Sequence, residues 1–154
     1  LIFYKQMREK RLLHLVRRLQ TLLEDYKQAV SSKYIRDIRQ VQGQLPEVFN
    51  QIDWLTGLTM DLKQERLFLG KILNPVIRLF GMEGIKSEAL EDTLVQCAHV
   101  RTSAHLLYDC CQWLVHESAG REQLTHEAIA HERIAMNQHL LDETLSKVQS
   151  IKET

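Results

Sequence analysis

Histidine and carboxylate side chains are the groups in this sequence best suited to chemistry, and most of the histidines lie in its second half. Six of the seven histidines fall between residues 99 and 139. His126 and Glu127 are followed by His131, which is close to the H-E-x-x-H motif of zinc proteases. That motif places its histidines at i and i+4 on one helix face, whereas a spacing of i and i+5 puts them roughly 140° apart. The spacing therefore argues against a zinc site.

Pairs of carboxylates and histidines could form a second kind of metal site, the di-iron centre of four-helix bundles. Such centres use Glu-x-x-His pairs, and no E-x-x-H occurs in this sequence. Three pairs at i and i+4 do occur: Glu122 with His126, Glu127 with His131, and His139 with Glu143. Such pairs stabilise a helix surface by roughly a few tenths of a kcal/mol, with metal binding or a pH-responsive contact as alternatives. His131 also falls in the apolar stripe of its helix, which predicts a hydrogen-bonded core histidine.

Motifs for nucleotide binding and nucleophilic catalysis are also missing from the sequence. The stretch from Gly81 to Gly84 lacks every other element of a phosphate loop, and there is no nucleophile elbow or Walker pattern. Long helices with few glycines offer few concave pockets with converging polar groups. We therefore predict a protein that is not an enzyme and has no catalytic residue, cofactor, metal or small-molecule substrate. A metal-bearing four-helix-bundle enzyme is the least favoured alternative.

The elements that must position any site are predicted to be helices. The chain of 154 residues is 44% hydrophobic and 26% charged, which is typical of one globular domain. It contains six glycines and two prolines, too few for the frequent turns of an all-β protein. Apolar residues recur at steps of three and four from Leu12 to Val30, and Val48, Leu55, Leu62, Leu69 and Val76 follow a seven-residue spacing.

This periodicity predicts an all-α fold, an elongated antiparallel bundle of about four long helices with coiled-coil-like packing. We place the helices at about residues 1–44, 47–80, 87–118 and 121–152 within a single domain, 1–154. Leu45-Pro46 should separate the first two helices, and Asn74-Pro75 should kink or restart the second. The region from Gly81 to Lys86 is the clearest loop, and Gly120 suits a helix C-terminus. A break at Ser31-Ser32 remains an open alternative.

Three cysteines bear on the compartment of the protein. Cys97, Cys110 and Cys111 are an odd set without C-x-x-C spacing, which favours buried thiols in a reducing environment. We predict an intracellular, cytoplasmic protein, with the nucleus as the alternative. Residues 1–10 mix apolar and charged side chains without a secretory signal pattern, and we expect the chain to be a fragment of a larger one. No apolar run is long enough to span a membrane.

A second apolar line on the third helix is the first candidate for a partner surface. Beside its main stripe, this helix carries Val95, Leu106, Cys110 and Trp113 along roughly the opposite face. These residues either close the core of the bundle or contact another helical subunit or a second copy. Trp113 would be the natural anchor, because aromatic residues dominate binding hot spots.

Basic residues on the first helix are the second candidate. Residues 1–44 carry a net charge of +6 and residues 45–154 carry −6, although the chain is neutral overall. The sequence predicts that Arg17 and Arg18 point away from the apolar stripe and that Arg8 and Arg11 border it, which leaves a solvent-facing basic strip. An ordinary solvated helix face is the alternative for these charges. Low aromatic content and a neutral pI argue against nucleic acid in particular.

These features together favour a non-enzymatic interaction domain. We expect a scaffold, an adaptor or a subunit of an intracellular multiprotein assembly, which binds partner helices through apolar seams. The alternative is electrostatic docking of the basic first helix on an anionic partner such as a membrane surface, nucleic acid or a cytoskeletal polymer.

Overall fold

Four long helices account for almost all of the chain that the structure describes. In the computed structural model, residues 2–82, 84, 88–124 and 127–153 are described. The helices are α1 (Ile2–Ser32), α2 (Ile35–Leu79), α3 (Glu88–Glu117) and α4 (Glu127–Glu153). The prediction of an all-α bundle of about four long helices is confirmed.

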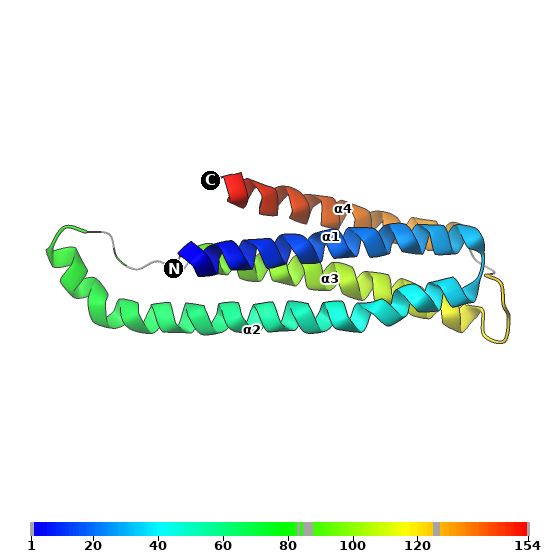
Figure 1. Ribbon diagram of the computed structural model, residues 1–154, viewed down its shortest axis with the longest axis horizontal. Helices are drawn as coiled ribbons and strands as arrows, with labels where there is room; N and C mark the ends of the chain where they lie inside the picture. Colours follow the sequence, from blue (N-terminus) through cyan, green and yellow to red (C-terminus); the bar gives the residue numbers. More distant parts are fainter. Residues whose placement is uncertain (1, 83, 85–87, 125–126, 154) are drawn as a thin grey trace.

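The helices lie side by side along one long axis (Figure 1). α1 packs against all three other helices, and α3 packs against α2 and α4, whereas α2 and α4 make no contact within the described part of the chain. α2 is the longest helix, with 45 residues. It runs past the ends of its neighbours and bends over its last turns (Figure 1). Pro75 lies within this last stretch, and proline is an ordinary cause of a helix bend.

The core is a continuous apolar column made by the stripes that the sequence pattern predicts. Its largest fully buried side chains come from every helix and include Leu19, Tyr26, Ile52, Leu107 and Leu141. Burial of each such side chain stabilises the fold by roughly 1.5–3 kcal/mol relative to leaving it in water. Thus the three- and four-residue spacing of apolar residues decides which face of each helix turns inward.

The first helix ends at Ser32, so the predicted boundary at Leu45-Pro46 is wrong and the open question at Ser31-Ser32 is answered. Lys33 has a left-handed backbone conformation, with φ of 68°, which ends α1. The Ser32 hydroxyl donates to the Asp37 carboxylate at 2.7 Å and accepts from the Tyr34 N–H at 3.3 Å. Asp37 lies in the first turn of α2, where a negative charge complements the helix dipole.

Pro46 lies inside α2 instead of ending it. Leu45 and Val48 on either side of it are almost completely buried in the core. Pro46 itself is exposed. Because proline has no N–H, the carbonyl four residues earlier loses its helical hydrogen bond, and water can supply the missing donor on this exposed side of the helix. Packing of the apolar face of α2 therefore keeps the helix continuous at Pro46, although proline disfavours a helix locally.

Pro46→Ala is expected to stabilise the protein. The substitution restores a backbone donor and removes the ring from the interior of α2, which outweighs the entropy that proline takes from the unfolded chain. We expect the free energy of unfolding to rise by about 1–2 kcal/mol, measured by urea denaturation followed by circular dichroism. The change of the exposed Gln40 to alanine, six residues before Pro46 in the same helix, should leave stability within about 0.5 kcal/mol. A destabilised Pro46→Ala variant would show that α2 needs the proline.

The connection between α3 and α4 also differs from its prediction. Helix four was predicted from residue 121, but residues 121–124 are not helical. The Leu124 N–H donates to the Lys33 carbonyl at 2.9 Å, and the Ile35 N–H donates to the Glu122 carbonyl at 3.1 Å. These bonds tie the connection to the turn between α1 and α2, and backbone groups paired in this way are not available for a helix. Gly120 has φ of 79° in the turn after α3, as its predicted role requires.

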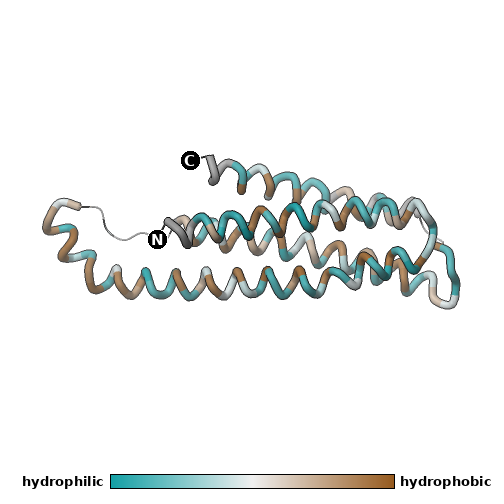
Figure 2. Tube along the Cα trace, in the orientation of Figure 1, coloured by the Kyte–Doolittle hydropathy of each residue, from teal (hydrophilic) through white to brown (hydrophobic). Residues whose placement is uncertain are grey.

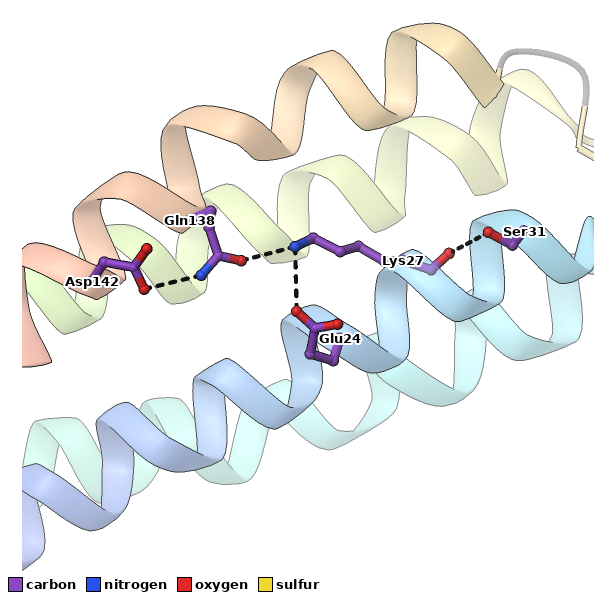
Figure 3. Close-up of polar contacts among 5 residues, drawn as sticks. All are labelled: Glu24, Lys27, Ser31, Gln138 and Asp142. Carbon is purple, nitrogen blue, oxygen red and sulfur yellow. Dashed lines mark hydrogen bonds and ion pairs between the residues drawn. The ribbon is translucent and has the colours of Figure 1, made fainter.

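Polar side chains fix the relative positions of α4 and its neighbours. The Asn137 amide donates to the Ser103 carbonyl at 3.1 Å, and its oxygen accepts from the Ser103 hydroxyl, with both residues buried. On the outer side of α1, the Lys27 amine donates to the Gln138 side-chain oxygen at 2.9 Å, and Gln138 donates to Asp142 (Figure 3). A buried polar pair that is fully bonded favours one register between helices.

Candidate interaction surfaces

The last turns of α2 and the residues directly after them carry the largest group of exposed apolar side chains among the described residues. We call this group the α2 overhang: Leu67, Phe68, Leu69, Ile72, Leu73, Val76, Leu79, Phe80 and Met82. Exposure ranges from 38% at Leu69 to 84% at Leu79. Figure 2 shows apolar residues gathered on the part of α2 that extends beyond the other helices. Contiguous apolar surface of this kind usually marks an interaction site.

The α2 overhang continues the packing seam of α2 past the point where its neighbours end. Along the seven-residue spacing, Val48 and Leu55 are buried, Leu62 is half-buried, and Leu69 and Val76 are exposed. The sequence pattern is the same along this line. The first residues of this line are buried because neighbouring helices cover them, and the last are exposed because the neighbours have ended. The periodicity of the sequence does not reveal where that happens.

Two basic residues flank the most exposed apolar side chains of the overhang. At 100° per residue, Phe68, Ile72 and Leu79 fall within about 40° of one another, and Lys71 and Arg78 fall within about 20° of each other roughly 90° away. No residue between Arg66 and Met82 is acidic. The surface therefore combines apolar contact area with a positive flank.

A groove between α1 and α2 is the second candidate surface. Its volume is about 830 Å³, within the usual range for a ligand site, although the sequence offered no expectation of a pocket. From α1 it is lined by Gln6, Met7, Lys10, Arg11, His14 and Leu15, and from α2 by Glu47, Asn50, Gln51 and Trp54. Trp54 is 48% exposed, and the Arg11 guanidinium lies 4.4 Å from the centre of its ring.

The sequence-predicted basic strip on α1 is only partly solvent-facing. Arg11 and Arg17 are exposed, and the half-exposed Arg18 donates to the Gln44 side-chain oxygen. Arg8 is buried, with 2% exposure, so its predicted place in a solvent-facing strip is wrong. Burial lowers the pKa of Arg8, and the nearby charge of Arg66 lowers it further. Its Nε and Nη1 atoms are buried without a hydrogen-bond partner, and burial of an unpaired charged group lowers the stability of the fold.

The second apolar line of α3 is divided between core and surface. Cys110 is 6% exposed and belongs to the core, and Trp113 is half-buried against it, with the Arg133 guanidinium 4.4 Å from its ring centre. Leu106 is half-buried, and Val95 is 48% exposed. The structure therefore places Trp113 in packing between α3 and α4, and the four residues do not form one exposed patch.

The apolar surfaces that the sequence prediction missed have a recognisable signal. Trp54 directly precedes Leu55 of the apolar stripe, so it cannot share the inward face, and a tryptophan outside the stripe is a candidate for an exposed anchor. Between residues 67 and 80, apolar residues occupy most positions around α2 rather than one stripe. A helix segment that is apolar on several sides requires more partners than one bundle seam provides.

Histidines and carboxylates do not form a metal site within the described residues. No group of three or more His, Cys, Asp or Glu side chains there could hold a metal ion. His131 is exposed, so the prediction of a core histidine at this position is wrong, because the buried face of α4 passes instead through Ala130 and Ile134. The structure does not describe His126.

All three cysteines are free and buried. Burial raises the pKa of the Cys97 and Cys110 thiols, and it raises the pKa of Cys111 to about 12, with a smaller contribution from Cys110. A thiol held in its neutral form is a poor nucleophile and a poor metal ligand. These cysteines therefore act as small apolar groups of the core.

Comparison with known proteins adds no function to these surfaces. Within the described helices, no segment is long and apolar enough to cross a membrane. The sequence matches no protein-family model, no curated protein and no solved structure.

Proposed function

We propose that the protein is a non-enzymatic interaction domain that associates with helical partners through the α2 overhang. One observation carries the proposal: nine large apolar side chains between residues 67 and 82 are exposed at the end of a helix that runs past its own bundle and just after it. Burial of apolar surface is the main driving force of most protein association. The mechanism is the completion of a helix-packing seam by a second molecule.

A second copy of the chain is the simplest partner for this surface. The same apolar surface can complement itself, since two copies related by a two-fold axis can place it against its counterpart. The seven-residue spacing that reaches Leu69 and Val76 is the spacing of helix-to-helix packing. In such a pair, Lys71 and Arg78 would remain at the solvent-exposed edge, where their charges are not desolvated.

Phe68→Asp combined with Ile72→Asp is expected to weaken self-association at least tenfold. Both side chains are more than half exposed, at 64% and 55%, so the change places two charges in the interface while removing no core contact. We expect the wild-type mass measured by sedimentation to rise with concentration, and the variant to remain monomeric. Thermal unfolding of the dilute variant should match that of the wild type.

Controls separate an interface from a general effect of added charge. Gln28→Asp and Gln149→Asp lie at exposed, polar positions of α1 and α4, away from the overhang, and this pair should leave association unchanged. A fluorescent dye that binds exposed apolar surface should bind monomeric wild type more strongly than the Phe68→Asp, Ile72→Asp variant. Monomeric wild type at about 100 μM would contradict the second copy as partner, and equal dye binding would contradict the interaction surface itself.

A further inference from the structure

The groove between α1 and α2 combines an apolar base, an exposed aromatic ring and an excess of basic side chains. Its base is apolar, formed by the buried Leu15 and the half-buried Met7. One wall carries the exposed ring of Trp54, and the Arg11 guanidinium lies over this ring, 4.4 Å from its centre. A large aromatic ring with a fixed cation is a preformed contact that loses little entropy on binding.

The charge of the groove is positive and not neutralised. Lys10, Arg11 and His14 line it from α1, and Glu47 is the only carboxylate among the described residues that line it. Glu47 already accepts a hydrogen bond from the Gln51 amide at 3.4 Å. Within the described residues neither Lys10 nor Arg11 makes an ion pair, whereas Arg101, an exposed cation on α3, pairs with Asp53 at 2.6 Å. A concave surface on which one sign of charge is in excess concentrates ligands of the opposite sign.

The shape of the groove favours an elongated ligand. Its lining residues follow steps of three and four along both helices, from Gln6 to Leu15 on α1 and from Glu47 to Trp54 on α2. A groove between two helices that lie side by side can bind a third helix, whose apolar residues at i, i+3, i+4 and i+7 then contact the groove. The rim side chains Gln6, Asn50 and Gln51 can donate hydrogen bonds to carboxylates as well.

We propose that this groove binds an amphipathic, acidic helical segment of a partner protein. The apolar face of the segment contacts Met7, Leu15 and Trp54, and its carboxylates lie against Lys10 and Arg11. Single-stranded nucleic acid fits less well, because it requires several aromatic rings along a longer basic track, and among the described residues that line the groove Trp54 is the one tryptophan, tyrosine or phenylalanine. The groove is separate from the α2 overhang, so its occupancy does not depend on self-association.

Trp54 provides a direct reporter for the test. The sequence contains two tryptophans, so Trp113→Phe leaves Trp54 as the only one. The probe is a synthetic helix of about sixteen residues with leucine and phenylalanine on one face and glutamate elsewhere. Its addition is expected to change the emission of Trp54 with saturation in the micromolar range. Calorimetry with the wild-type protein gives the same measurement if Trp113→Phe disturbs folding.

Matched variants assign the binding to the groove. Lys10→Glu combined with Arg11→Glu should weaken binding at least tenfold. Arg17→Glu combined with Arg39→Glu changes the net charge equally at exposed positions outside the groove, and should weaken binding less than threefold. Raising the salt concentration should weaken binding to the wild type, because the groove cations are exposed.

Four results would overturn the proposal. They are binding weaker than about 1 mM, equal binding of a probe whose glutamates are replaced by lysine, equal losses in the two double variants, and tighter binding of a single-stranded oligonucleotide than of the acidic helix. The last result would assign the groove to nucleic acid instead.

Discussion

Replacing Tyr26 with alanine is expected to lower the free energy of unfolding by about 3–5 kcal/mol. The Tyr26 side chain is 0% exposed and is among the largest fully buried side chains of the core. It reaches from α1 to α4, where its hydroxyl lies 3.5 Å from the Ala130 carbonyl oxygen. The alanine variant loses the transfer free energy of the ring and leaves a cavity among four helices that cannot all move inward. Urea denaturation followed by circular dichroism measures the loss.

Tyr26→Phe separates the packing of the ring from the bonding of the hydroxyl. The distance of 3.5 Å is long for a hydrogen bond between a hydroxyl and a carbonyl oxygen, so its loss should lower stability by less than about 1.5 kcal/mol. If Tyr26→Phe proved as damaging as Tyr26→Ala, the hydroxyl and not the ring would hold α1 against α4.

The helices and their buried faces follow from local sequence rules. Leu12, Leu19 and Tyr26 share one face of α1 because seven residues make almost two helical turns, and all three are buried. No knowledge of the neighbours is needed for that conclusion. The bundle could therefore be predicted, since each long helix with such a stripe must cover it with another.

Helix boundaries depended on contacts between distant segments, which the local rules do not contain. Pro46 was expected to end a helix, but burial of Leu45 and Val48 outweighs the cost of one lost hydrogen bond. The true break at Lys33 is stabilised by hydrogen bonds to Glu122 and Leu124, about ninety residues further along the chain. Tertiary packing decided both positions.

The candidate surfaces were only partly predictable for the same reason. Arg11 and Arg17 are exposed as expected, but Arg8 lies where α2 covers α1, close enough to Arg66 for the two charges to repel. The position of Trp54 opposite Arg11 depends on the antiparallel alignment of α1 and α2, which no spacing within one helix specifies. The length by which α2 exceeds its neighbours likewise appears only in the assembled bundle.

The stability of the protein is expected to fall steeply in alkaline solution. Burial raises the pKa of Cys111 to about 12 in the folded state, against an ordinary value of 9.0. The folded protein therefore keeps this thiol neutral, while the unfolded chain gains stability by ionising it above pH 9. Its contribution is complete below pH 9 and is lost as the pH rises towards 12, at about 1.4 kcal/mol per pH unit and about 4 kcal/mol in total.

Cys97 and Cys110 add to the effect in the same direction, because burial raises the pKa of each thiol as well. Burial also raises the pKa of Tyr26, so ionisation of its phenol in the unfolded chain extends the loss above pH 10. Denaturant titrations between pH 7 and pH 11 measure the slope. At neutral pH the same burial should protect all three thiols from a thiol-specific reagent until the protein unfolds.

Cys111→Ala identifies the share of the slope that belongs to one buried thiol. The variant loses a few atoms of packing and is therefore less stable at pH 7, but its stability should fall less steeply by about 1 kcal/mol per pH unit between pH 9 and pH 11. The two curves should therefore converge as the pH rises. Parallel curves for wild type and variant would mean that Cys111 ionises in the folded protein, and that the interior around it is accessible to water.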